Sequence, residues 1–193
     1  MRHFIISPVH QLILSGLLLV LAACEKEDTR VLPEATREGR NTGGCLINGK
    51  AFVATGWPSG GILGPNAIPP LTGGFAFDSA YYVTLYGLYN GENVAIMLYL
   101  QNDKPGTYLL NRNTQYYPQG SPRYILSHAT YRVVGASGGE IYVTSVQHTG
   151  RVKLTYADSR SGIGSGTFEF TAASTIIPTK TITITQGRFD RKQ

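Results

Sequence analysis

Apolar and polar residues alternate along the last part of the chain, a pattern that predicts strands with one face in a core and the other in water. Residues 151–156, 167–172 and 181–185 follow this period, and their inward-facing side chains would be Val152, Leu154, Tyr156, Phe168, Phe170, Ile182 and Ile184. We predict that these strands form one side of a hydrophobic core and that Phe189 packs the tail against it. If neighbouring strands pair antiparallel, the outward-facing Lys153 and Glu169 would be close enough for an ion pair.

Two Asn-Gly pairs separate apolar runs earlier in the chain. Asn48-Gly49 lies between residues 45–47 and 50–53, and Asn90-Gly91 lies between residues 75–89 and 94–100. A type I′ turn needs positive φ at both central residues, which Asn and Gly tolerate better than other residues. We therefore predict two β-hairpins, with residues 75–89 forming one strand.

Further short strands are expected at 107–110, within 124–134 and at 141–146. Two long segments interrupt the strands: residues 55–73 are rich in Gly and Pro, and residues 111–123 are mostly polar. Loops of this length are usually functional or disordered. Gly164-Ser165-Gly166 leads into a strand, and we interpret it as a turn.

No segment after residue 23 combines a 3.6-residue period with helix caps. Many short strands joined by Gly, Pro and Asn turns predict an all-β fold. We expect a single antiparallel β-sandwich. A closed or partly open up-and-down β-barrel is the alternative, because the two-residue period is the same in both.

Residues 1–23 have the layout of a secretory signal peptide, with a basic start, an apolar run and small residues at the end. Leu21-Ala22-Ala23-Cys24 resembles the lipobox of bacterial lipoproteins, which implies lipidation of Cys24 and removal of residues 1–23. A transmembrane helix is the alternative, but Leu12–Ala23 is too short to cross about 30 Å of hydrocarbon. We therefore predict a membrane anchor through lipid on Cys24.

Residues 24–43 hold many charges and almost no large apolar side chains, which predicts a flexible tether ahead of an antiparallel β domain at residues 44–193. Lys26, Glu27 and Asp28 follow the cysteine in an order that resembles the surface-export signal of Bacteroidota lipoproteins. This resemblance implies an outer-membrane lipoprotein that faces the cell exterior. The periplasmic face is the alternative.

The formal net charge is +5 at pH 7. The basic residues form no long stripe, so we expect no nucleic-acid partner. The chain has two cysteines, and with Cys24 assigned to lipid, Cys45 has no disulfide partner. Its apolar neighbours predict a small buried side chain.

Four blocks of sequence resemble an uncharacterised family of small Bacteroidota β-rich lipoproteins. They are residues 41–50, 106–111, 164–172 and 184–190. The family has no assigned function, so the resemblance implies localisation and a β fold and transfers no catalytic residue.

Catalytic patterns are scarce in the expected domain. His128 and His148 lie at no metal-ligand spacing with another His, Cys or acid, so we expect no metal site and no cofactor. No Gly-x-Ser-x-Gly elbow is present, because the Gly-rich pentapeptide at residues 162–166 has Ile163 at its second position and no serine at its centre. We expect a non-enzymatic protein, and a hydrolase is the least favoured alternative.

Aromatic side chains in the two long loops are the remaining functional indication. An aromatic ring can cover the C–H face of a sugar while loop amides bind its hydroxyls, which makes Trp57, Tyr116 and Tyr117 candidate ligand-binding residues. Burial of tyrosine rings in strands is the structural alternative. The sequence thus predicts a binding or accessory module for an extracellular glycan or protein, with a structural or assembly component of the cell envelope as the alternative.

Overall fold

The computed structural model describes residues 31–58, 67–77, 79–118, 125–134 and 139–193. The predicted signal peptide, Cys24, Lys26, Glu27 and Asp28 lie outside these ranges. In chain order, the strands are β1 (Thr42–Ile47), β2 (Lys50–Val53), β3 (Leu71–Ala76), β4 (Ala80–Tyr89), β5 (Glu92–Leu100), β6 (Gly106–Leu109), β7 (His128–Val134), β8 (Glu140–Val143), β9 (Gly150–Asp158), β10 (Ile163–Ser174) and β11 (Thr181–Lys192). The described residues contain no helix, so the prediction of an all-β fold is confirmed.

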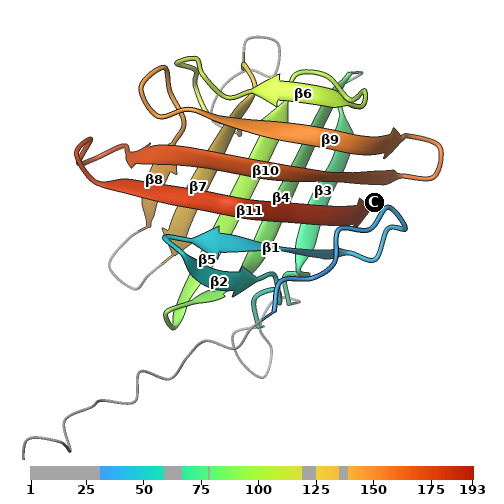
Figure 1. The fold of residues 1–193 in the computed structure, drawn as a ribbon, viewed down its shortest axis with the longest axis horizontal. Coiled ribbons are helices and arrows are strands. Elements are labelled where there is room, and N and C mark those ends of the chain that lie inside the picture. Colours follow the sequence, from blue (N-terminus) through green and yellow to red (C-terminus); the bar gives the residue numbers. More distant parts are fainter. Residues whose placement is uncertain (1–30, 59–66, 78, 119–124, 135–138) are drawn as a thin grey trace, which may run out of the picture.

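All the strands belong to one antiparallel sheet that curls into a half-barrel (Figure 1). The front layer runs β2-β1-β11-β10-β9-β6, and the back layer runs β8-β7-β5-β4-β3. β10 joins the layers, because its first part pairs with β9 and its end, at Ala173 and Ser174, pairs with β8. The layers cross at a large angle in Figure 1, an arrangement that agrees with either a sandwich or an open barrel.

The hydrophobic core lies between the two layers. It contains the predicted inward-facing residues Val152, Leu154, Phe168, Phe170, Ile182 and Ile184, together with Phe189. From the back layer it receives alternate residues of β4 and β5, including Val83, Leu85, Ile96 and Leu98. The alternation read from the sequence therefore identified the buried face of the front layer, although Tyr156 is only half-buried.

Both predicted Asn-Gly turns are present. Asn48 and Gly49 have φ of 47° and 83°, and Asn90 and Gly91 have φ of 51° and 80°. Positive φ at both positions is the geometry of a type I′ hairpin.

The prediction of one strand over residues 75–89 is wrong. The chain turns at Phe77, whose φ is 52°, and this turn separates β3 from β4. β3 also begins at Leu71, within the segment predicted to be a loop, because Leu71 pairs with Leu85 of β4 and is buried. The Pro residues just before Leu71 concealed the start of this strand.

The interpretation of Gly164-Ser165-Gly166 as a turn is also wrong, because all three residues lie inside β10. A side chain on Gly164 would meet the ring of Tyr81 at 2.4 Å, and one on Gly166 would meet the Lys153 carbonyl oxygen at 2.5 Å. The two glycines therefore allow neighbouring groups to pack closely against β10, and they do not form a turn.

The pairing expected between Lys153 and Glu169 is replaced by another. Glu169 lies opposite Arg151 on β9, and Arg151 Nη2 is 2.8 Å from Glu169 Oε1. Lys153 lies opposite Thr167. The register of β9 against β10 determines which residue faces Glu169. This register contains a shift, or irregularity, between Ser165 and Gly166.

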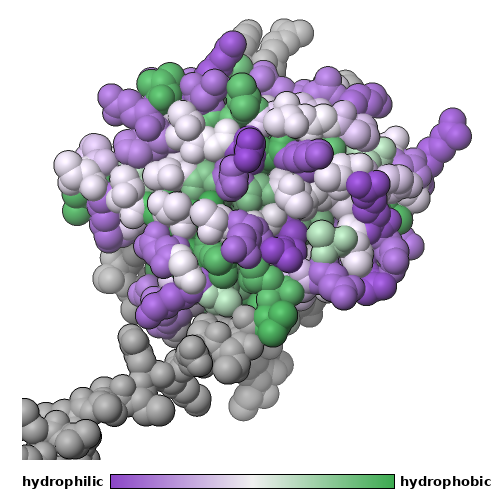
Figure 2. Space-filling view, in the orientation of Figure 1, coloured by the Kyte–Doolittle hydropathy of each residue, from purple (hydrophilic) through white to green (hydrophobic). Residues whose placement is uncertain are grey.

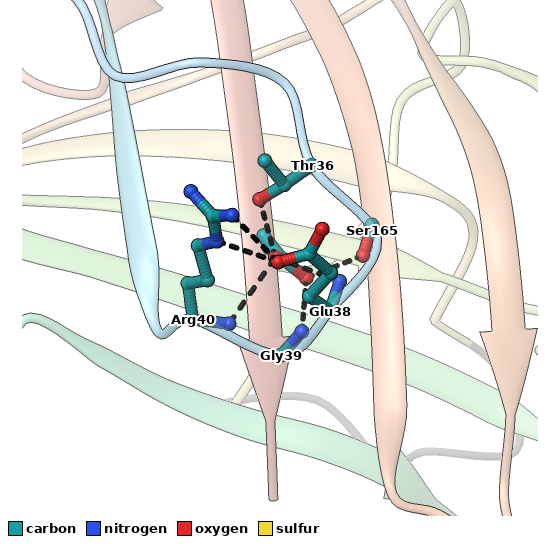
Figure 3. A network of polar contacts seen from close by, with 6 residues as sticks. Thr36, Glu38, Gly39, Arg40 and Ser165 are labelled. Atoms are coloured by element: carbon teal, nitrogen blue, oxygen red, sulfur yellow. Dashed lines mark hydrogen bonds and ion pairs between the residues drawn. The ribbon is translucent and has the colours of Figure 1, made fainter.

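The N-terminal segment contacts the domain before β1 begins. One polar network joins this segment to the β domain (Figure 3). Its labelled members are Thr36, Glu38, Gly39, Arg40 and Ser165. Its centre is Asp190 of β11, which accepts hydrogen bonds from the Thr36 hydroxyl, the Ser165 hydroxyl and the amides of residues 38–40. Residues 36–41 thus lie against the β domain, and the boundary predicted at residue 44 falls inside β1.

Cys45 is fully buried and free, as predicted. Burial raises the pKa of its thiol far above the usual range. Within the described residues, no helix is long and apolar enough to cross a membrane.

Candidate functional site

A surface cavity of about 580 Å³ lies where the loop after β6 meets the ends of β8 and β10. Its lining consists of Asn113, Thr114, Gln115, Tyr116, Val143, Thr144, Ser145, Gln147, His148, Ala173, Thr175 and Pro178. We call it the Tyr116 pocket. Its volume lies within the range of small-molecule binding sites.

Hydrogen bonds fix the loop that forms one wall of the Tyr116 pocket. Asn113 Oδ1 accepts a hydrogen bond from the amide of Val146 at 3.2 Å, which ties the loop to the segment after β8. Thr114 Oγ1 accepts one from the amide of Leu126 at 3.0 Å, which ties it to the segment before β7. The two bonds therefore tie the loop, just before Tyr116, to two other segments of the chain.

A tight turn at residues 145–148 forms another part of the lining. The Ser145 amide donates to the His148 carbonyl at 2.8 Å, and Ser145 Oγ accepts hydrogen bonds from the amides of Gln147 and His148. His148 Nδ1 lies 3.4 Å from Ser145 Oγ. Because the hydroxyl oxygen already serves the turn, this Ser-His pair has the geometry of a turn motif.

The polar groups of the pocket are amides, hydroxyls and the His148 imidazole, and none of its lining residues is Asp, Glu, Lys or Arg. Charged residues close to the lining in sequence are Arg112, directly before Asn113, and the pair Glu140 and Lys180, whose Oε2 and Nζ are 2.6 Å apart. Glu140 Oε1 also accepts a hydrogen bond from Ser174 Oγ at 2.9 Å. The bond from Lys180 lowers the pKa of Glu140. This cluster connects β8 to the end of β10 and the turn that follows it.

Tyr117 has different surroundings from Tyr116. Its ring packs against Tyr82, Tyr99 and Phe77, at centroid distances of 5.2, 5.6 and 5.8 Å. These contacts cover the outer face of β4 and β5. We therefore assign Tyr117 to the packing of the loop against the back layer.

His128 supports this packing from β7. Its Nε2 accepts a hydrogen bond from the Tyr117 amide at 3.1 Å, and its Nδ1 lies 2.8 Å from the Leu126 carbonyl oxygen. Burial lowers the pKa of His128 to about 4. The imidazole is thus neutral near pH 7, and its neutral form matches both hydrogen bonds.

Trp57 lies apart from both tyrosines. Its ring meets Tyr86 edge to face at 4.9 Å, and its Nε1–H donates to the carbonyl oxygens of Gly87 and Val94. Tyr86 and Tyr82 lie on the same face of β4, separated by about 13 Å along the strand. The structure therefore places the three predicted ligand-binding residues in three environments, and only Tyr116 lines the pocket.

Sequence reasoning missed the other residues that line the pocket with Tyr116, among them Gln147 and Thr175. Residues 113–116, 145–148 and 173–178 are far apart in sequence and carry no shared motif. They meet because β8 pairs with both β7 and β10, and the period of the sequence contains no information about that pairing.

Comparison with protein families gives a match to a domain of unknown function, DUF6252, over residues 74–191. This range runs from β3 to β11 and contains the whole lining of the Tyr116 pocket. The chain belongs to the DUF6252 family. The prediction that the family is uncharacterised is confirmed. Searches of curated proteins and of solved structures gave no match for this DUF6252 protein.

Proposed function

We propose that this DUF6252 protein is a non-enzymatic binding module and that the Tyr116 pocket binds an uncharged oligosaccharide. The composition of the pocket lining carries the proposal. One tyrosine ring stands among side-chain amides, hydroxyls and the His148 imidazole, and the lining holds no Asp, Glu, Lys or Arg. An aromatic ring can cover the apolar face of a sugar, and amides can donate to and accept from its hydroxyl groups.

The location of the module in the cell is proposed from the sequence alone. Residues 21–24 resemble a lipobox, and this resemblance supports a lipid anchor at Cys24. Lys26, Glu27 and Asp28 resemble an export signal, which supports an outer-membrane lipoprotein of Bacteroidota type that faces the exterior. An extracellular glycan would reach the Tyr116 pocket in that location.

The ligand is tested by screening the protein against an array of neutral glycans and titrating the best binder. Tyr116→Ala should weaken binding at least tenfold, because it removes the stacking surface. Tyr116→Phe keeps the ring and should lose only a few-fold. Equal binding by the wild type and Tyr116→Ala would contradict the proposed site.

The location is tested by protease treatment of intact cells. The wild type should be digested, whereas a Lys26→Ala, Glu27→Ala, Asp28→Ala variant should be protected. Protection of both proteins would place the domain on the periplasmic side and would contradict surface display.

A protein partner is the second candidate. The turn between β10 and β11 exposes Ile176 and Ile177, which are 72% and 51% accessible, directly beside the pocket residues Thr175 and Pro178. Exposed apolar side chains are common at protein interfaces. An envelope-assembly role would be supported if crosslinking in membranes captured one partner that is lost in Ile176→Ser, Ile177→Ser.

A further inference from the structure

The outer face of the front layer carries a groove of about 680 Å³ that is separate from the Tyr116 pocket. Its lining consists of Ala35, Thr107, Arg151, Lys153, Thr167, Phe168, Glu169, Gln186, Gly187 and Arg188. We call it the Arg188 groove. It lies on the face shown in Figure 2, where hydrophilic side chains stand over β9, β10 and β11.

The strand register places two cations on either side of a hydroxyl. Lys153 of β9 lies opposite Thr167 of β10, and Thr167 lies opposite Arg188 of β11. Thr107 of β6 lies on the other side of Lys153. With strands about 4.8 Å apart, the backbones of Lys153 and Arg188 are roughly 10 Å from each other. An acidic group above Thr167 could thus be reached by both long side chains.

The charge of the groove is unbalanced. Arg151 pairs with Glu169 at 2.8 Å. Among the described residues, Lys153 and Arg188 have no acidic partner. The Arg188 guanidinium donates to the backbone carbonyls of Gln186 and Pro33. These bonds orient the guanidinium and leave its charge without a counter-ion.

We propose that the Arg188 groove binds an acidic saccharide, one whose carboxylate or sulfate groups lie between Lys153 and Arg188. A guanidinium and an ammonium supply charge-assisted hydrogen bonds to such groups. The hydroxyls of Thr107 and Thr167 and the amide of Gln186 can bind sugar hydroxyls beside them. The groove goes beyond the proposed neutral-glycan site, because it uses a different face and a different chemistry.

A concave surface with a net positive charge favours a linear anionic ligand over a membrane. Docking on anionic lipid needs cations spread over a flat or convex face, whereas here the cations line a hollow together with Ala35, Phe168 and Gly187 and with an acidic residue, Glu169. We therefore commit to the saccharide and make the membrane an outcome of the test.

The experiment titrates the full chain with trigalacturonate and with a sulfated disaccharide at low and at high salt. The wild type should bind at least one of them, and high salt should weaken binding because it screens charge pairs. Lys153→Glu, Arg188→Glu should lose at least tenfold in affinity. The matched variant Lys50→Glu, Arg160→Glu makes the same change of charge at exposed positions outside the groove and should stay within about threefold of the wild type.

Three results would overturn the proposal. One is the absence of binding by the wild type to both acidic saccharides. Another is an equal loss in the two double variants, which would mean that only net charge matters. The last is binding to phosphatidylglycerol vesicles that depends on Lys153 and Arg188 while neither saccharide binds, which would identify a membrane contact.

Discussion

The carboxylate of Asp190 accepts a hydrogen bond from the hydroxyl of Thr36 at 2.5 Å, across a sequence separation of 154 residues. Asp190 is 1% exposed. Burial alone would raise the pKa of its carboxyl, but the hydrogen bonds from Thr36, Ser165 and the amides of Arg40 and Gly39 outweigh it and hold the pKa at about 2. The start of the described chain is thereby attached to the end of β11.

Asp190→Asn should destabilise the protein by about 2 to 3 kcal/mol at pH 7, because the Asn amide would present donors to groups that are themselves donors. Urea unfolding measures this change. Glu38→Gln is the matched control: its side chain is exposed and, among the described residues, pairs with Arg40 alone, so it should cost less than about 0.5 kcal/mol. Equal stability of Asp190→Asn and the wild type would show that this network does not hold the segment.

The wild type should also lose stability on strong acidification. The folded pKa of Asp190 lies below its unfolded value, so its contribution is complete above about pH 4 and disappears as the pH falls toward 2, with a size of about 2 kcal/mol. The difference in unfolding free energy between wild type and Asp190→Asn should therefore shrink over this range. A constant difference would contradict the role given to the charge.

His128 should cause a second loss of stability on acidification, in a higher pH range than the loss caused by Asp190. Burial depresses its folded pKa to about 4, so the stabilisation is complete above its unfolded pKa of about 6.5 and is lost as the pH falls toward 4, by about 3 kcal/mol. His128→Gln has no charge to acquire, and it should flatten the curve of unfolding free energy against pH in this window. An unchanged slope would mean that another group causes it.

Gly150→Ala tests the close packing of β9 against β10. A Cβ at this position would lie 2.2 Å from Phe170 Cβ and 2.5 Å from the Glu169 carbonyl oxygen, and backbone atoms cannot move aside easily. We expect a loss of about 2 kcal/mol or more. Gly106→Ala on β6 is the control, because its nearest neighbours are 3.9 Å away. Similar melting temperatures for the two variants would refute the packing argument.

Cys45 should be inert to a soluble thiol reagent in the native state. Burial keeps the thiol protonated and out of contact with solvent. In the variant Cys24→Ser, the reagent should label no thiol before denaturation and one thiol in denaturant. Rapid native labelling would mean that the core opens around β1.

The sequence predicted the core positions of β9, β10 and β11, because each has one face in the core and one in water. It predicted the Asn-Gly turns for a similarly local reason, namely the φ that those residues tolerate. It failed at Phe77, where a bulky residue adopts the positive φ that ends β3. The turn residues that follow it in the sequence, Asp78 and Ser79, stand inside an otherwise apolar run that predicts one strand. It failed at Gly164–Gly166 because glycines that admit the Tyr81 ring look like turn glycines in the sequence.

The candidate site was predicted only in part. Tyr116 could be chosen because it is an aromatic residue in a polar loop, but Trp57 and Tyr117 satisfied the same criterion and have structural contacts. What separates them is the position of each ring relative to the back layer. That position depends on the long-range pairing of β7 with β5, which local sequence does not encode.

The central claim is that the Tyr116 pocket binds an uncharged oligosaccharide. The most direct test is to titrate the protein with the best neutral binder and to map the amide chemical-shift changes in the two-dimensional NMR spectrum. The account predicts changes that cluster at residues 113–116, 145–148 and 173–175, with saturation. Changes centred on Trp57 or on the Arg188 groove, or none at saturating ligand, would contradict it.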